Sequence, residues 1–275
     1  MSHLFIFGLG YTAGRLARTL VPKGWTIEST GSAGTLAFED EAAVAAALSR
    51  ATHVLSSVPP DEDNDTVLKR YEGQLRGAPA RWIGYLSSTG VYGDTRGAWV
   101  DESAPVGHGR RNARTAADLA WQGLGRAVHV FRLPGIYGPG RSALDRIREG
   151  RARRIAVPDQ VFSRVHVDDI LSGVMASMSR PAGIYNLADD FPCSQNDVIA
   201  HGCALLDLPV PPMQSIEEAG LSPAARAFYA ENRRVANGKA KRLLGWRPRF
   251  ADYRSGLSAC LAAESLPQGN DHAGQ

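Results

Sequence analysis

A glycine-rich turn directly after the first apolar run constrains the fold more than any other feature. Residues 4–7 are apolar, the sequence GLGYTA follows at 8–13, and the apolar residues after it recur at helical spacing. A strand, a G-x-G-x-x-A turn and a helix in this order form the phosphate-binding unit of dinucleotide-binding folds. Gly8 permits the tight turn, Gly10 lets a pyrophosphate approach the backbone, and Ala13 lets the helix pack closely on the strand. The alternative to a dinucleotide site is an ordinary strand-to-helix turn that uses glycine for its positive φ angle.

Apolar runs and helical patterns alternate along the first half of the chain. Strands are expected over residues 4–7, 25–30, 52–57, 82–87 and 128–133. Helices are expected over 13–20, 41–48, a segment ending near 75, and about 112–124. This alternation predicts an α/β fold with a doubly wound, nucleotide-binding parallel sheet, over which the later segments build a smaller lobe.

Regular alternation ends near residue 140. Helices are expected beyond it at 143–149, at 168–178 with Asp168 as the N-terminal cap, and near 216–229. The predicted domains are a Rossmann domain over 1–133, to which 164–188 returns, and a smaller substrate-binding lobe over 134–163 and 189–275.

Composition excludes several classes of protein. The 275 residues are 44% hydrophobic and 21% charged with a net charge of +3, which is typical of a soluble globular protein and does not indicate nucleic-acid binding. The three cysteines have neither disulfide-framework nor zinc spacing, and no metal motif is evident. With no signal peptide and no run of 18 apolar residues, we expect a cytoplasmic protein that is not bound to a membrane.

The end of the second expected strand bears on the choice between NAD and NADP. NAD-selective sites place an acid there to hold the ribose hydroxyls, whereas this chain has Thr30, Gly31 and Ser32. Glu28 lies three positions before the turn, where a strand interior is expected. Arg15 or Arg18 would neutralise a 2′-phosphate, although both are equally well explained as solvated helix residues. The cofactor is therefore NAD or NADP, with a lean to NADP.

Several ordered motifs carry a family resemblance across nearly the whole chain. They are LSSTGVYGD at 86–94, FRLPGIYGPGR at 131–141, RVHVDDI at 164–170, YNLADD at 185–190 and KRLLGWRP at 241–248. Together they resemble the extended short-chain dehydrogenases/reductases, the NAD(P)-dependent epimerase/dehydratase family. The resemblance implies an NAD(P)-binding Rossmann fold with a small C-terminal substrate lobe. The fingerprint and this resemblance assign the cofactor to Gly8, Leu9, Gly10, Tyr11, Thr12, Ala13, Thr30, Gly31, Ser32, Ser57, Val58, Pro59, Ser87, Pro134 and Ile136.

The sequence departs from the family's pattern at the catalytic helix. Family members carry a catalytic Tyr four residues before a Lys, and counting back from Asp118 places Arg110 and Arg114 at these positions. An arginine is almost never deprotonated, so Arg110 is an anion binder rather than a general acid or base. Ser88 matches the family's polarising Ser/Thr, and Tyr92 is an alternative phenol that also fits a packing role.

The substrate expectations rest on the cleft motifs. Thr89, Tyr137, Arg141 and Arg164 are assigned to the substrate, and the guanidinium groups favour an anion, a sugar nucleotide being one candidate. Tyr137 also fits packing, and His166 is expected to be structural. The alternative to anion binding is that most of the arginines, especially Arg151, Arg153 and Arg154, lie on solvated surfaces. The expected function is an NAD(P)-dependent oxidoreductase or epimerase/dehydratase-like protein, as a monomer or homodimer. A catalytically inactive NAD(P)-binding sensor or regulator is the alternative.

Overall fold

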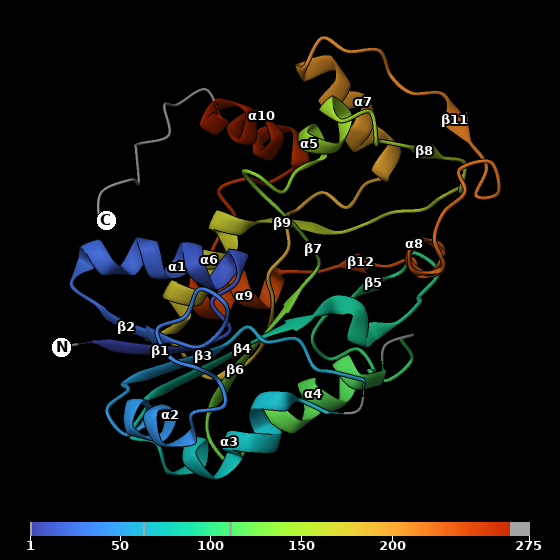
Figure 1. Ribbon diagram of the computed structural model, residues 1–275. Coiled ribbons are helices and arrows are strands. Elements are labelled where there is room, and N and C mark those ends of the chain that lie inside the picture. Colours follow the sequence, from blue (N-terminus) through green and yellow to red (C-terminus); the bar gives the residue numbers. More distant parts are fainter. Residues whose placement is uncertain (1, 63, 110–111, 265–275) are drawn as a thin grey trace.

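A six-stranded, fully parallel sheet forms the centre of the molecule (Figure 1). The computed structural model describes residues 2–62, 64–109 and 112–264. The sheet order is β10-β6-β4-β3-β1-β2. The strands are β1 (His3–Phe7), β2 (Thr26–Ser29), β3 (His53–Ser56), β4 (Trp82–Ser88), β6 (Val128–Leu133) and β10 (Gly183–Asn186). The predicted doubly wound α/β fold is thereby confirmed.

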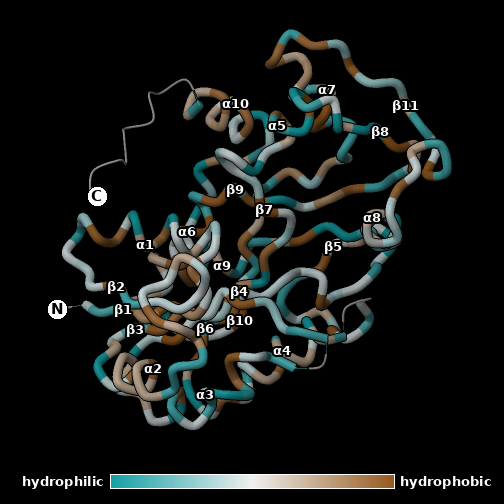
Figure 2. Tube along the Cα trace, viewed as in Figure 1, coloured by the Kyte–Doolittle hydropathy of each residue, from teal (hydrophilic) through white to brown (hydrophobic). Residues whose placement is uncertain are grey.

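Helices cover both faces of the sheet (Figure 1). One face carries α1 (Tyr11–Leu20), α6 (Val167–Ser177) and α9 (Gly238–Leu244), and the other carries α2 (Glu41–Leu48), α3 (Thr66–Gly77) and α4 (Asn112–Gln122). Two separate hydrophobic cores result, because each strand buries side chains on both of its faces. Hydrophobic residues accordingly run along the central strands in Figure 2.

The strand order reverses between β1 and β3, which lie side by side. From β1 the chain crosses to β2 at the edge, then returns through α2 to β3 on the opposite side of β1. The connections that leave β1 and β3 therefore diverge at the carboxyl edge of the sheet. In open parallel sheets, ligands bind in the crevice at such a switch point.

A smaller lobe stands over the carboxyl edge of the sheet (Figure 1). Its two-residue and three-residue strands form the pairs β5 (Trp99–Val100) with β12 (Arg234–Val235), β7 (Gly135–Tyr137) with β9 (Arg164–His166), and β8 (Arg154–Ile155) with β11 (Met213–Gln214). Its helices are α5 (Ala143–Arg148), α7 (Gln195–Leu205), α8 (Pro223–Tyr229) and α10 (Tyr253–Glu264). Short 3-10 helices are η1 (Val21–Lys23) and η2 (Thr89–Tyr92). Residues of α5, α7 and α10 share a core with Tyr137.

The later elements differ from expectation in several places. Strand β10 and helices α7, α9 and α10 are absent from the sequence prediction, and only Pro223–Tyr229 of the expected 216–229 segment is helical. Helix α9 packs Ala240 and Leu244 into the core of the sheet, so part of 189–275 joins the Rossmann side of the molecule. In the described part of the chain, no helix has both the length and the apolarity needed to cross a bilayer.

The expected cap of helix α6 is wrong. The N-terminal cap is His166, whose ring Nδ1 accepts a hydrogen bond from the Asp168 backbone N–H at 3.2 Å. The Asp168 carboxylate instead receives a hydrogen bond from Arg15 of α1 at 2.8 Å. Helix α6 begins one residue earlier than expected, and this shift places Asp168 inside the first turn, where its charge still favours the helix dipole.

Candidate active site

A cavity of about 370 Å³ lies at the carboxyl ends of β1, β2 and β3. Its lining residues are Gly8, Leu9, Gly10, Thr30, Gly31, Ser32, Phe38, Ser57, Val58, Pro59 and Thr66. All but Phe38 and Thr66 belong to the predicted cofactor residues. The structure therefore brings the glycine-rich turn together with the ends of the two neighbouring strands, as the fold requires at its switch point.

The turn has the geometry that a pyrophosphate needs. Gly8 has φ +80°, and a Cβ there would lie 2.8 Å from Val58 Cγ2, so the position is restricted to glycine. Gly10 is extended, and a Cβ there would meet nothing within 4 Å, because it would point into open space. Helix α1 starts at Tyr11 with no side-chain cap and no acid in its first turn. Its first N–H groups are thus left for an anion, and the residues fit a dinucleotide.

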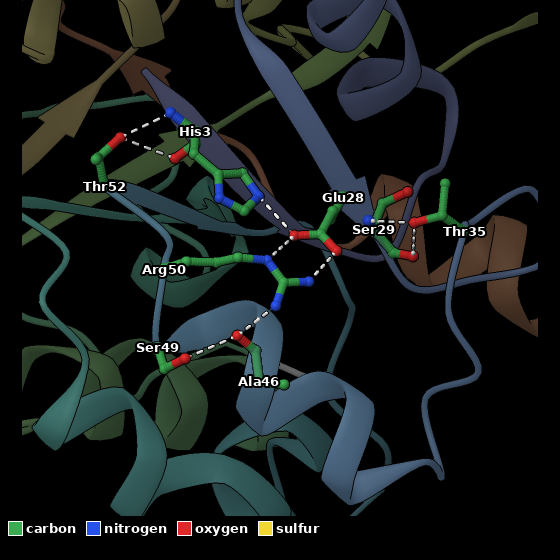
Figure 3. A network of polar contacts seen from close by, with 8 residues as sticks. All are labelled: His3, Glu28, Ser29, Thr35, Ala46, Ser49, Arg50 and Thr52. Atoms are coloured by element: carbon green, nitrogen blue, oxygen red, sulfur yellow. Dashed lines mark hydrogen bonds and ion pairs between the residues drawn. The ribbon is translucent and has the colours of Figure 1, made fainter. Parts of the chain in front are cut away.

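Glu28 is not at the ribose end of this cavity. Figure 3 shows its carboxylate held between His3 and Arg50. His3 Nε2 lies 2.7 Å from one carboxylate oxygen, and Arg50 Nε donates to the same oxygen at 2.9 Å. The hydrogen bond from Arg50 holds the pKa of Glu28 below its ordinary value. Glu28 lies inside β2, as expected, and its carboxylate serves this ion-pair network.

Arg15 and Arg18, the candidates for binding a 2′-phosphate, do not line the cavity. Arg15 forms its ion pair with Asp168 on α6, and Arg18 is exposed on α1. The residues that line the cavity include neither an acid nor a base. Hydroxyl groups of Thr30 and Ser32 are the polar side chains at the end of β2, and Thr30 Oγ1 accepts from the Gly8 N–H at 3.3 Å.

A larger cleft of about 910 Å³ separates the carboxyl edge of the sheet from the smaller lobe. It shares Gly10, Ser57 and Pro59 with the first cavity, so the two form one continuous track. Predicted residues in its lining are Tyr11, Thr12, Ser87, Ser88, Thr89, Arg114, Pro134, Ile136, Tyr137, Arg141 and Arg164. Tyr92 does not line the cleft, and Arg110 lies outside the described residues.

Ser88 stands at the carboxyl end of β4, half-buried in the wall of the cleft. Its Oγ accepts a hydrogen bond from the Gly90 N–H at 3.1 Å, which caps η2. Among the described residues, no acceptor takes the Ser88 hydroxyl hydrogen. Ser88 can therefore donate to a ligand atom in the cleft.

Ser87 belongs to a buried polar network behind the cleft. Its Oγ donates to Asp118 at 2.5 Å, and Arg132 donates to the same carboxylate at 3.1 and 2.8 Å. Arg132 also donates to the Tyr92 hydroxyl at 3.1 Å, and Tyr92 donates to Asn186 at 2.8 Å. With its hydroxyl tied to these partners, Tyr92 holds η2 against β6 and β10, an arrangement that favours the packing role over the catalytic one.

The described tyrosines of the cleft are poor proton acceptors. Burial raises the pKa of Tyr11, Tyr137 and Tyr253. Tyr11 donates to the Pro139 carbonyl at 3.0 Å. His166, buried beneath the cleft, has its pKa lowered to about 4 by burial, as suits the structural role expected for it.

Arginines dominate the charged lining of the cleft. Within the described residues these are Arg114, Arg141, Arg146, Arg151, Arg164 and Arg233, against the acids Asp145, Glu149 and Glu231. Guanidinium groups bind carboxylate and phosphate in a bidentate manner, so the cleft suits an anion. Most hydrogen-bond donors of the Arg164 guanidinium already have protein partners, because Arg164 donates to Phe162, Cys193, Ser194 and Gln195.

Some lining residues escaped the sequence prediction. Arg151 lines the cleft and pairs with Glu149, and 66% of its side-chain surface is exposed, as expected of a solvated residue. Arg146, Arg233, Phe162, Phe228 and Tyr253 also line it. They come from segments far apart in the sequence, and only the basic stretch at 151–154 gave a signal. No group of three or more potential metal ligands occurs in the described part of the chain.

No family model matches the sequence. Two curated relatives are each 26% identical to this chain. Protein YeeZ of Escherichia coli K12 is matched over 80% of this chain and 89% of its own length. The 3-diazoavenalumate denitrifying reductase of a Streptomyces species is matched over 75% of this chain and 76% of its own length.

Solved structures extend these similarities. MoeE5 in complex with UDP-glucose and NAD has TM-score 0.75 at 17% identity, covering 95% of this chain and 98% of its own. Human epimerase family protein SDR39U1 with NADPH has TM-score 0.76 at 16% identity, covering 96% and 100%. A conserved protein of unknown function from Silicibacter pomeroyi DSS has TM-score 0.87 at 42% identity, covering 96% and 99%. This chain therefore belongs to the same family as the Silicibacter protein, and it has the Rossmann fold that these NAD-binding and NADPH-binding epimerase/dehydratases share.

Proposed function

We propose that this protein is an NAD(P)-dependent reductase of a small anionic substrate. The observation that carries the proposal is the continuous track from the glycine-rich turn, through Gly10, Ser57 and Pro59, to Ser88 and the arginine-lined cleft. A dinucleotide that lies along this track has its adenosine half in the smaller cavity. Its nicotinamide half then faces the cleft in which the substrate binds.

Different residues of the track bind the pyrophosphate, the nicotinamide and the substrate. The uncapped start of α1 holds the pyrophosphate, and Pro134 and Ile136 flank the nicotinamide side of the cleft. Ser88 donates a hydrogen bond to the reacting end of the substrate, and Arg114 stabilises negative charge that develops there. When bound, a reduced dinucleotide supplies two electrons as hydride to an electrophilic substrate atom, and solvent supplies the balancing proton.

Reduction is a better match for this cleft than epimerisation or dehydration. Those reactions begin with removal of a proton from a substrate hydroxyl or carbon, which calls for a base poised near neutrality. The described tyrosines of the cleft have raised pKa values, and an arginine stays protonated. Hydride addition instead builds up negative charge, which Ser88 and Arg114 can stabilise without losing a proton.

The comparisons support this reading. A Streptomyces relative is named as a reductase, and a neighbour of similar fold binds NADPH. The cavity at the end of β2 has no acid that would repel a 2′-phosphate. We therefore propose NADP(H) as the preferred cofactor.

The test is turnover by the purified protein with NADPH and a panel of aldehydes, ketones and conjugated acids that carry a carboxylate or phosphate. We expect NADPH oxidation with one class of these. Ser88→Ala and Arg114→Met should each lower kcat by about 10²-fold. The matched exposed controls Ser258→Ala and Arg153→Met should leave it unchanged. Cofactor binding without turnover across the panel, together with no effect of Ser88→Ala on any binding constant, would contradict the proposal.

A further inference from the structure

One wall of the cleft, built by the smaller lobe, carries two stacked aromatic rings. Phe162 precedes β9 and Phe228 belongs to α8, and their ring centroids are 4.4 Å apart with an interplanar angle of 12°. Both rings line the cleft. Tyr229 meets both rings edge-on, at 5.8 and 6.0 Å, and so fixes their orientation. The pair is a rigid, flat apolar surface in the same cleft as the lining arginines.

Phe228 is unusually exposed for a ring in such a stack. It keeps 44% of its surface accessible, although a second residue of the same type lies against it. An aromatic ring left open in a concave site is a typical feature of a surface that a ligand covers. The exposed part of Phe228 is therefore the natural place for a flat apolar group.

Two arginines lie near these aromatic residues. The Arg164 guanidinium carbon lies 6.0 Å from the centre of the Phe162 ring. Burial raises the pKa of Tyr229, and the nearby Arg146 and Arg164 act in the opposite direction. Arg141 and Arg146 line the cleft, and neither has an acidic partner among the described residues. An anion can thus bind within reach of the aromatic surface.

We propose that the substrate combines a flat aromatic ring with an anionic group, as a small aromatic acid does. The ring stacks on Phe228, and Arg146 with Arg141 binds the anion. A saturated, hydroxyl-rich body fits this wall less well, because the Phe162–Phe228 surface offers its hydroxyls no hydrogen-bond partner. This inference rests on the proposed reductase function and names the substrate class of the same cleft.

Calorimetric titration of the NADP⁺-loaded protein with chosen probes tests the inference. The probes are trans-cinnamate, its saturated-ring analogue 3-cyclohexylpropanoate, the uncharged cinnamyl alcohol, and UMP. Cinnamate should bind about three- to tenfold more tightly than 3-cyclohexylpropanoate, the range expected for one aromatic pair. Cinnamyl alcohol should bind more weakly than cinnamate by a larger factor, because it lacks the anion.

Two variants with matched controls assign these effects to residues. Phe228→Leu should bring the cinnamate-to-cyclohexylpropanoate ratio close to one, whereas Phe191→Leu, at another exposed ring outside the cleft, should preserve it. Arg146→Gln should weaken both carboxylates, whereas Arg153→Gln, an exposed arginine outside the cleft, should not.

Several results would overturn the inference. They are equal affinity for the two carboxylates, no binding of cinnamate at all, or tighter binding of UMP than of cinnamate, which would assign the surface to a nucleobase. A parallel titration with NADPH separates this failure from failure of the reductase proposal. If NADPH does not bind, the reductase proposal fails, and the ring preference is still measured on the cofactor-free protein.

Discussion

Arg132 of β6 and Asp118 of α4 form a two-bond ion pair from which solvent is excluded, with side chains only 2% and 0% exposed. Asp118 also accepts from Ser87, the neighbour of Ser88, and lies one helical turn after Arg114. The pair thus joins the strand end and the helix that present the proposed catalytic groups. Its position behind the cleft makes it a positioning element for both.

Removal of Arg132 should strongly destabilise the fold. Arg132→Met leaves the Asp118 carboxylate buried without its cation, which costs about 3–5 kcal/mol in comparable pairs. The half-exposed pair between Arg148 and Glu264 provides the control, and Arg148→Met should cost less than about 1 kcal/mol. Urea denaturation measures both free energies of unfolding. Similar losses in the two variants would show that the buried pair has no special role.

Ser32→Glu should reverse the proposed preference for NADP. Ser32 lines the cavity at the end of β2, where a carboxylate would hydrogen-bond ribose hydroxyls and repel a 2′-phosphate. We expect NADPH affinity to fall by about tenfold or more, while NADH affinity stays equal or rises. The same substitution at exposed Ser258 on α10 should change neither. If wild type already binds NADH more tightly, or Ser32→Glu leaves NADPH affinity unchanged, the assignment of this cavity end to the 2′-phosphate is wrong.

Asp189→Asn should stabilise the protein, increasingly so at higher pH. Burial raises the pKa of Asp189 to about 8, and its Oδ2 has no hydrogen-bond partner among the described residues. Between about pH 4 and 8 the folded state keeps a proton that the unfolded state has lost, so stability falls as pH rises through this window. The asparagine variant has no such dependence.

Urea denaturation at pH 5 to 8 measures this difference. The variant should gain about 1–3 kcal/mol over wild type by the alkaline end. A stability difference that stays constant across the range would mean that Asp189 is already ionised in the folded protein.

Local sequence patterns were sufficient to predict five of the six strands of the central sheet and the glycine-rich turn at its carboxyl edge, whereas β10 was not predicted. The fingerprint at 8–13 and the apolar strands depend on neighbours within a few residues, and α2 and β6 have the predicted bounds. Ser88 and the ends of β1 and β3 could be placed because parallel strands all end at one edge.

Features that depend on distant contacts could not be predicted. The stack of Phe162 on Phe228 joins segments 66 residues apart. The ion pair of Arg132 with Asp118 could not be predicted because no local spacing links β6 to α4. Asp168 carries the typical capping side chain, yet the tertiary ion pair with Arg15 and the cap by His166 decide its role. Helix α7 was not predicted because it has neither the amphipathic periodicity of α1 nor the alanine-rich composition of α2.

The central claim, a dinucleotide on the glycine-rich turn, is tested most directly by calorimetric titration of nucleotide-free protein with NAD⁺, NADH, NADP⁺ and NADPH. Gly10→Asp is the key variant, because its side chain would enter open space where the pyrophosphate is expected and the extended backbone accepts it. Gly73→Asp, at an exposed open position on α3, is the control. We predict binding by wild type and Gly73→Asp, tightest for NADPH, and none by a folded Gly10→Asp. Absence of binding by wild type, or equal binding by Gly10→Asp, would contradict the account.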